Sequence, residues 1–249
     1  MQAFGGPVLL HDGDAPDLLS PASAAEDIGR VSVMLSALDG QGPGSLRLYR
    51  PQATAAFAPR DTVLAAYAEA AAAMCNRGFT PAERRAGGQL AVYDRSALVI
   101  DLIAPHEEPR RDVKQRFAMF SGAIATALKG LRVDARVGPV PGEYCPGDYS
   151  VNAGGTLKLA GLAQRIGRRG YHMGAVISVH PSAAAREAVA TAYGILGLPF
   201  TPESFGALST CAPDVGFADL RAALTGEISQ LIGIAGTSPP AGWIRGLQA

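Results

Sequence analysis

A cysteine in a turn-like segment is the first residue of this chain that could do chemistry. Cys145 lies in the run Gly-Glu-Tyr-Cys-Pro-Gly-Asp-Tyr that occupies positions 142–149. Its proline, glycine and acidic neighbours predict a loop, and not a buried apolar run. A thiolate presented on a loop can reach a ligand and is a strong nucleophile. Cys145 is therefore a candidate nucleophile, although an exposed loop cysteine can also be idle.

A lone lysine inside a short apolar segment is the candidate partner of this thiol. Lys158 lies in Thr-Leu-Lys-Leu-Ala-Gly, positions 156–161. Lysine is seldom buried without a partner, so Lys158 either faces solvent or points into a polar pocket. In a pocket its ammonium would favour a nearby thiolate and stabilise a developing oxyanion. The loop itself contains no histidine, and His106 or His172 would serve as a base only if the fold brings one of them near.

A pair of glycines before a strand-like segment is the third feature. Gly87 and Gly88 follow Arg84 and Arg85 and precede the apolar run 90–93. Glycines in this position let the backbone approach a ligand closely, and the arginines could meet a carboxylate or a phosphate. A Gly-Gly turn also occurs in ordinary hairpins, so this signal is weak by itself.

The elements that must position these residues follow from hydrophobic periodicity and turn signals. Helices are predicted at 20–35 with Pro21 in the first turn, between the N-cap candidate Asp61 and Gly78, and at 111–128, 182–196, 202–208 and 217–232. Strands are predicted at 46–49, 90–93, 97–103, 131–137, 157–160 and 175–179, with 90–93 and 97–103 forming a hairpin. Cys75 falls on the apolar face of its helix and is expected to be a buried hydrophobe, whereas Cys211 is expected to be a bystander. Because strands and helices do not alternate regularly, we predict the α+β class, with a mixed or antiparallel sheet and helices packed on it.

The composition narrows the classes of function. The 249 residues carry 22 basic and 22 acidic side chains, so the formal net charge of zero argues against nucleic-acid binding. No apolar run is long enough for a membrane span, and the first residues do not resemble a secretory signal. Three widely spaced cysteines do not indicate a disulfide framework or a zinc cluster. We therefore expect a cytoplasmic protein without a metal site, folded as a single domain over residues 1–249.

Taken together, the three features resemble one family, the lipoate-protein ligases and octanoyltransferases. Arg85, Ala86, Gly87 and Gly88, followed by 90–92, resemble its R-x-S-G-G-x-x-V signature, with Ala86 where serine is common. The run 158–165, Lys-Leu-Ala-Gly-Leu-Ala-Gln-Arg, resembles the family's lysine segment. The Cys145 loop is similar to the G-x-Y-C-P-G-x-Y loop of one branch, the octanoyl-[H protein]:protein octanoyltransferases. The resemblance covers about 46–180 and leaves a helical extension at about 182–249.

This resemblance implies a catalytic domain of the biotin-protein-ligase and lipoate-ligase type, and a mechanism. Cys145 would take an octanoyl or lipoyl group as a thioester and pass it to a lysine of a lipoyl carrier domain, while Lys158 holds the carbonyl oxygen. The residues implied to bind the acyl group or substrate are Arg85, Gly87, Gly88, Ala160, Gly161 and Gln164. The implied partners are lipoyl carriers (the glycine cleavage H protein and the acyltransferase subunits of 2-oxoacid dehydrogenases) or acyl carrier protein. No cofactor would be required.

Two other interpretations stay open. An ATP-dependent lipoate-protein ligase would use Lys158 with an acyl-adenylate, would need ATP and magnesium, and would not need Cys145. A non-catalytic member of the family would only bind lipoyl domains.

Overall fold

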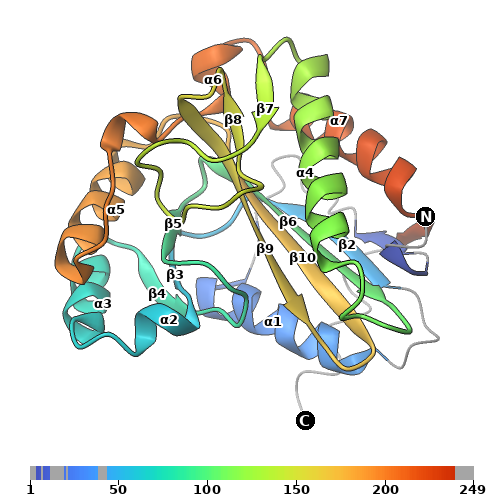
Figure 1. Cartoon of the computed structure of the whole chain (residues 1–249), viewed down its shortest axis with the longest axis horizontal. Coiled ribbons are helices and arrows are strands. Elements are labelled where there is room, and N and C mark those ends of the chain that lie inside the picture. Colours follow the sequence, from blue (N-terminus) through green and yellow to red (C-terminus); the bar gives the residue numbers. More distant parts are fainter. Residues whose placement is uncertain (1–3, 7, 12–19, 21, 39–43, 239–249) are drawn as a thin grey trace.

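A large mixed sheet and a small sheet form the framework of the protein (Figure 1). The computed structural model describes residues 4–6, 8–11, 20, 22–38 and 44–238. The large sheet has the strand order β11-β1-β2-β6-β10-β9-β8-β7, and the small sheet has the order β4-β3-β5. The strands are β1 (Val8–His11), β2 (Gly44–Tyr49), β3 (Thr54–Phe57), β4 (Thr80–Glu83), β5 (Ala91–Tyr93), β6 (Ala97–Pro105), β7 (Ala135–Val137), β8 (Val151–Ala153), β9 (Leu157–Ile166), β10 (Gly170–Ser178) and β11 (Ile234–Ser238). With helices packed on these mixed sheets, the predicted α+β class is confirmed.

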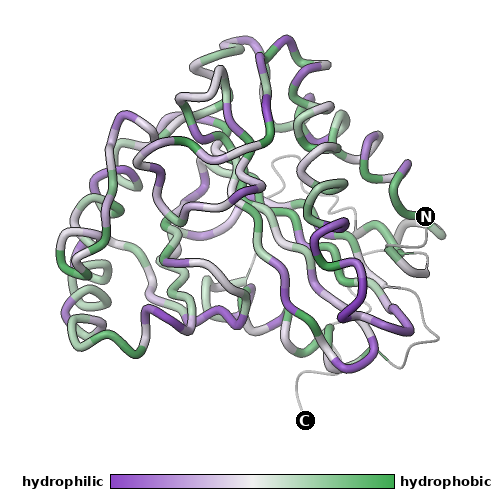
Figure 2. Tube along the Cα trace, in the orientation of Figure 1, coloured by the Kyte–Doolittle hydropathy of each residue, from purple (hydrophilic) through white to green (hydrophobic). Residues whose placement is uncertain are grey.

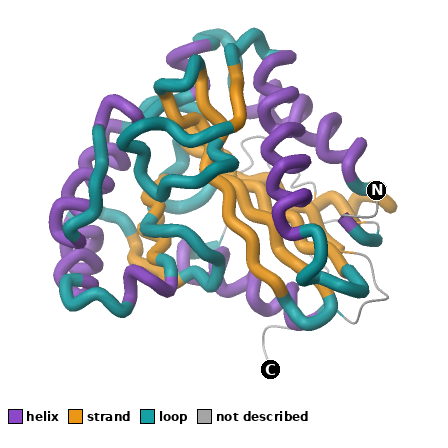
Figure 3. The backbone as a smooth tube through the Cα atoms, in the orientation of Figure 1, coloured by secondary structure: helices purple, strands orange, loops and turns teal. Residues whose placement is uncertain are grey.

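The helices cover both faces of the large sheet. They are α1 (Ala24–Ala37), α2 (Pro59–Thr62), α3 (Tyr67–Asn76), α4 (Val113–Gly130), α5 (Ala183–Leu196), α6 (Leu208–Cys211) and α7 (Phe217–Leu231), with a 3₁₀ turn η2 at Pro202–Ser204. Helices α4 and α7 pack together over one face of the sheet, whereas α1 contacts β6, β10 and β4 (Figure 1). Figure 3 shows the small sheet as a separate group of strands, with α3 and α5 on one side of it and the large sheet on the other. In Figure 2 the turn between β9 and β10 stands out as hydrophilic.

The centre of the large sheet is antiparallel and in continuous register. Strands β6 and β10 pair from Gly170 opposite Pro105 to Ser178 opposite Ala97. Because both faces of the sheet are covered, every residue of β6 is buried. Alternate residues of β6 and β10 join the core beneath α4 and α7, which includes Phe120, Ile124 and Leu224. The intervening residues face α1 and the small sheet, and they form the wall of the candidate site.

Several predicted boundaries are wrong, and local hydrogen bonds explain why. The first helix begins at Ala24 because Ser23 and Glu26 form a capping box; Pro21 lies outside the described residues. Asp61 does not cap a long helix. It sits inside α2, where its carboxylate accepts the backbone N–H of Ala58 at 2.8 Å. Gly78 does end the second helical segment, with a φ of 79°.

The predicted hairpin between 90–93 and 97–103 is also wrong. The turn exists, since the N–H of Ala97 donates to the carbonyl of Asp94 at 2.9 Å. However, β5 pairs with β3, whereas β6 pairs with β2 and β10. The turn therefore carries the chain from the small sheet to the large one. Cys75 is exposed and not buried, because α3 turns its other face, with Ala70 and Met74, toward the core.

The last third of the chain is less purely helical than predicted. Helices α5 and α7 match the predicted 182–196 and 217–232, but 202–208 is the turn η2 followed by the short α6. Strand β11 was not predicted. It pairs in parallel with β1, so the end of the described chain lies beside its beginning. Within the described ranges, no helix has the length and hydropathy needed to cross a membrane.

Candidate active site

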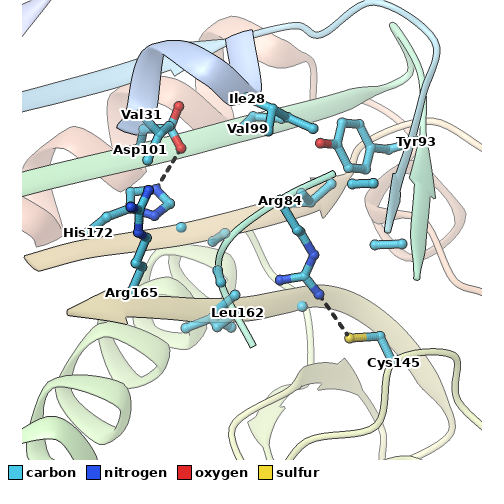
Figure 4. Close-up of a pocket in the computed structure, with 18 of the residues that line it drawn as sticks. Ile28, Val31, Arg84, Tyr93, Val99, Asp101, Cys145, Leu162, Arg165 and His172 are labelled. Atoms are coloured by element: carbon cyan, nitrogen blue, oxygen red, sulfur yellow. Dashed lines mark hydrogen bonds and ion pairs between the residues drawn. The ribbon is translucent and has the colours of Figure 1, made fainter. Parts of the chain in front are cut away.

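A cavity between the two sheets contains the residues that the sequence singles out. Its wall combines residues of α1, of the Arg84–Ala86 segment, of the Cys145 loop and of strands β9 and β10 (Figure 4). A second cavity is lined by the following part of the Cys145 loop and includes Gly147, Asp148 and Tyr149. Both cavities are lined by Cys145, Leu162 and Ala163. Cys145 therefore lies where the two cavities meet.

Small residues on alternate positions of two strands form the floor of the first cavity. On β9 these positions are Gly161 and Ala163, and their partners on β10 are Val176 and Gly174. The next pair in register is Arg165 opposite His172, and both line the same cavity. The floor therefore changes from small and apolar to polar with distance from Cys145 along β9 and β10. Such a floor leaves room for an aliphatic chain in its first part.

The backbone of Cys145 is held in an unusual conformation. Its φ is 43°, in the left-handed region that residues other than glycine seldom adopt. The Cys145 N–H donates to the hydroxyl of Tyr193 at 2.6 Å, and that hydroxyl donates to the carbonyl of Leu90 at 2.9 Å. Tyr193 belongs to α5 and is 1% exposed. Backbone conformations of this kind persist where the surroundings hold them, often at functional sites.

Two hydrogen-bond donors lie close to the thiol, and both belong to the segment 84–89, which we call the glycine turn. The N–H of Gln89 lies 3.2 Å from Cys145 Sγ, and Arg84 Nη2 lies 3.7 Å from it (Figure 4). Arg84 is held in place because its guanidinium also donates to the carbonyls of Gly87 and Gln89. Gly88, with a φ of 100°, has no Cβ. A Cβ there would lie 2.8 Å from both Arg84 Nη2 and Cys145 Sγ. Glycine at this position is therefore what allows the guanidinium and the thiol to meet.

Lys158 is buried and contacts three residues of the Cys145 loop. Its side chain is 1% exposed, and its Nζ lies 3.0 Å from Oε2 of Glu143, which is itself fully buried. The same Nζ donates to the carbonyls of Tyr144 at 2.8 Å and of Cys145 at 2.9 Å. Glu143 in turn accepts hydrogen bonds from the Gly147 N–H and the Ser150 hydroxyl, both at 3.1 Å. Of the two placements open to Lys158, the structure has it in a polar pocket.

A charged network lies at the polar end of the first cavity. His172 Nε2 is 2.8 Å from Asp101, and Arg47 contacts both Asp101 and Asp27 of α1. Burial alone would raise the pKa of Asp101, but the hydrogen bond from His172 and the charges of His172 and Arg47 hold it below its ordinary value. For Asp27 the balance is the opposite: burial raises its pKa by more than the positive charge of Arg47 lowers it. Gly174 makes room for the network, because a Cβ there would lie 2.8 Å from the His172 ring.

The structure brings most of the sequence-predicted site residues to these two cavities. Cys145, Lys158, Arg85 and Gly161 line the first cavity, and Gly87, Gly88 and Gln164 line the second. Ala160 does not line either cavity and is fully buried. The histidines separate as well: His172 lines the first cavity but pairs with Asp101, whereas His106 accepts the N–H of Glu108.

Gln164 has protein partners on both sides of its amide. Its oxygen accepts from Nε and Nη2 of Arg116 at 3.2 and 3.0 Å, and its nitrogen lies 2.7 Å from the sulfur of Met173. Arg116 is fully buried in α4. Gln164 thus anchors α4 to β9 in addition to lining the second cavity.

Around the thiol, Gln89, Glu143 and Tyr193 were not singled out from the sequence, and Arg84 was noted only as one of two arginines that could meet an anion. Arg84 had a signal. With Ala86 in the serine position of R-x-S-G-G, the arginine of the motif falls two positions earlier, on Arg84 and not on Arg85. Arg85 is exposed, while Arg84 reaches the thiol. Tyr193 and Gln89 act through long-range hydrogen bonds that no local sequence pattern predicts.

Three or more His, Cys, Asp or Glu side chains do not converge as a possible metal site anywhere in the described part of the chain.

The chain is similar in sequence to curated enzymes that share one name. Over 147 residues the chain is 30% identical to the octanoyl-[GcvH]:protein N-octanoyltransferase of Geobacillus kaustophilus, a match that covers 59% of this chain and 52% of the relative. The enzyme of the same name from Bacillus velezensis is 25% identical over 216 residues, covering 80% of this chain and 75% of the relative. The chain thus spans about half the length of the first of these relatives.

Solved structures show the same fold. A bipartite lipoate protein ligase from Thermoplasma acidophilum, studied with its E2 lipoyl domain, superposes with a TM-score of 0.69 at 17% identity, covering 94% of this chain and 88% of the other. A lipoate-protein ligase A bound with ATP gives a TM-score of 0.68 at 18% identity, covering 94% and 89%. The family model of the lipoyl protein ligase A/B catalytic domain matches residues 32–227. Because this match covers well over half of the sequence and includes both the Cys145 loop and Lys158, the chain belongs to the lipoyl protein ligase A/B catalytic domain family.

Proposed function

We propose that this protein is a cysteine-dependent acyltransferase that moves an octanoyl or lipoyl group between carrier proteins. The observation that carries this proposal is the position of Cys145. Its thiol lies where a cavity with a small, apolar floor meets a second cavity, and it faces a guanidinium and a backbone N–H. A thiol in an electropositive and partly exposed position has the surroundings of a reactive cysteine.

The reaction would proceed in two symmetrical steps. The Cys145 thiolate attacks the carbonyl carbon of an acyl group bound as an amide to a donor lysine. The carbon–sulfur bond forms, the carbon–nitrogen bond breaks, and the donor lysine leaves as an amine that carries the proton lost by the thiol. In the second step the amine of an acceptor lysine attacks the thioester, and the thiol takes its proton back. Atoms and electrons balance in both steps without a cofactor.

The two cavities would divide the substrate between them. The acyl chain would lie on the floor formed by Gly161, Ala163 and Gly174, where each buried CH₂ contributes roughly 0.8 kcal/mol. The lysine side chain of a carrier would approach through the second cavity. The rings of Phe117 and Tyr149, stacked 5.2 Å apart, line this cavity. The named activity of the relatives makes a glycine cleavage H protein the first donor to test, with lipoyl domains as acceptors.

The direct test is the acyl adduct itself. The protein is incubated with octanoylated H protein or octanoyl-acyl carrier protein, and its intact mass is measured before and after hydroxylamine. We expect a single octanoyl adduct that hydroxylamine removes, and we expect that Cys145→Ala forms none. Cys75→Ala is the matched control, since Cys75 is exposed on α3.

The same experiment separates the alternatives. If Cys145→Ala lipoylates a carrier at the full rate with ATP and free lipoate, the protein is a ligase and the proposal is wrong. Stable binding of a carrier, without an adduct from any donor and without ligation, would instead indicate a non-catalytic binding protein.

A further inference from the structure

We infer that Arg84 and the backbone N–H of Gln89 form the anion site of this acyltransferase, and that Lys158 is a positioning residue for the Cys145 loop. This inference rests on the proposed function and assigns its electrostatic roles. The charge that stabilises the reacting atoms is then that of Arg84 in the glycine turn, and not that of Lys158, the lysine of the family's motif.

The hydrogen bonds of Lys158 are the first argument. The Lys158 ammonium donates hydrogen bonds to the carbonyls of Tyr144 at 2.8 Å and of Cys145 at 2.9 Å, and its Nζ lies 3.0 Å from Glu143 Oε2 as an ion pair. The ion pair with Glu143 is sealed from water, with side chains 1% and 0% exposed. Movement of the Lys158 ammonium toward a substrate oxygen would draw it away from this buried ion pair. Breaking a buried ion pair of this kind is costly.

The contacts of Lys158 also explain what it does. Lys158 and Tyr193 hold Cys145 from its two backbone sides: Tyr193 accepts its N–H, and Lys158 donates to its carbonyl. Between these two anchors the residue keeps a φ of 43°. Lys158 therefore acts on the geometry of the loop, and through it on the direction of the thiol.

The donors around the thiol are the second argument. When a thiolate attacks a carbonyl, negative charge passes from sulfur to an oxygen two bonds away, so the oxyanion forms close to donors that lie beside the sulfur. Gln89 N–H and Arg84 Nη2 are at 3.2 and 3.7 Å from Sγ. Arg84 also has a buried Nε without a hydrogen-bond partner among the described residues. Preorganised donors of this kind are usually the largest electrostatic contribution to acyl transfer.

Gly88 is the third argument, because it links the two donors. Its missing Cβ leaves the space in which the guanidinium meets the thiol, and its positive φ turns the following N–H of Gln89 toward Sγ. Thus the glycine turn supplies both donors.

The test compares two variants in the full-length protein. Arg84→Gln removes the charge at the thiol. The double variant Glu143→Gln with Lys158→Gln replaces the buried ion pair with two neutral amides, so neither partner is left as an unpaired charge. Arg77→Gln, at the end of α3, is the control for loss of an exposed arginine. Circular dichroism and urea unfolding establish that each variant is folded.

Two readouts are measured for each variant: the rate of single-turnover acylation from octanoylated H protein, and the pH profile of Cys145 alkylation by iodoacetamide. For Arg84→Gln we expect acylation to fall about 10²- to 10³-fold, as for loss of one oxyanion donor, and alkylation to require a higher pH. The folded double variant should keep acylation within about tenfold and keep the alkylation profile of the unmodified protein.

Either of two results overturns the inference. One is an equal or larger loss of acylation in the folded double variant than in Arg84→Gln. The other is an unchanged alkylation profile in Arg84→Gln. The alkylation profile needs no acyl donor, so it still decides the role of Arg84 if acyl transfer fails with every donor and the proposed function is rejected.

Discussion

At the scale of single residues, Gly88 has the most demanding position in the site. The space that a Cβ would fill is occupied by Arg84 Nη2 and Cys145 Sγ, each 2.8 Å from the Cβ position, and the φ of 100° disfavours any side chain. A contact that close requires the guanidinium, the thiol or both to move. The effect of a substitution at Gly88 therefore has two parts, backbone strain and displacement of the reacting groups.

We expect Gly88→Ala to lower the rate of acyl-enzyme formation by at least tenfold, because it separates Arg84 from Cys145. Single-turnover acylation followed by intact mass measures this effect. Gly78→Ala is the matched control, since Gly78 has a similar positive φ of 79° with nothing within 4 Å of its Cβ position. Both variants should lose roughly 1 kcal/mol of stability through strain. An equal effect of both on acylation would contradict the role given to crowding.

At the scale of elements, α5 is tied to the Cys145 loop and to the start of β5 through one hydroxyl. Tyr193 accepts the N–H of Cys145 and donates to the carbonyl of Leu90, although the three residues are far apart in the sequence. The ring of Tyr193 also packs near Phe200, with ring centroids 5.8 Å apart. Helix α5 therefore helps to fix the position of the Cys145 loop, and with it the position of the thiol.

Tyr193→Phe should keep the packing of α5 and remove this bridge. The backbone N–H of Cys145 and the carbonyl of Leu90 then lose a buried partner, which costs about 1–3 kcal/mol of unfolding free energy. Urea unfolding should show this loss, and alkylation of Cys145 should become faster as the loop loosens. Tyr67→Phe, which removes an exposed hydroxyl bonded to Glu83, should change the stability by less than about 0.5 kcal/mol. An equally stable Tyr193→Phe variant would show that the bridge does not hold the loop.

At the scale of the whole molecule, buried charges join α1 to the large sheet at the end of the cavity. Arg47 on β2 pairs with Asp27 on α1 and with Asp101 on β6, and His172 on β10 completes the set. The pKa of Asp101 is lower in the folded protein than in the unfolded chain, because His172 and Arg47 outweigh burial. The unfolded chain therefore takes up this proton first as the pH falls.

The sign of the pH dependence follows from this difference. The contribution of Asp101 to stability is complete above its unfolded pKa of about 3.9 and is lost as the pH falls through that value toward the folded pKa. Asp27 works in the opposite direction, since burial raises its pKa. We expect the unfolding free energy of Asp101→Asn, measured in urea from pH 6 to pH 3, to fall less steeply than that of the unmodified protein. Asp214→Asn, at an exposed position, should keep the original slope. An identical slope in Asp101→Asn would contradict this account.

The sequence by itself determined the fold class and most helices, and it singled out Cys145 and Lys158 as candidates. Periodicity marked α4, α5 and α7 because each has a long apolar stripe that only burial can satisfy. Cys145 and Lys158 stood out because a loop thiol and a lysine in an apolar strand are unusual in their local surroundings. The short strands β3, β4 and β8 gave no such signal, since three or four residues carry too little periodicity.

Only the tertiary structure decided which residues touch the thiol and in what role. The turn 94–96 looks like a hairpin locally, but its two strands belong to different sheets because each finds a better partner far away in the sequence. The same long-range pairing brings Arg84 to Cys145 and Glu143 to Lys158. A motif can state that an arginine and a lysine are present. The packing of the two sheets decides that Arg84 faces the sulfur and that Lys158 pairs with the buried carboxylate of Glu143.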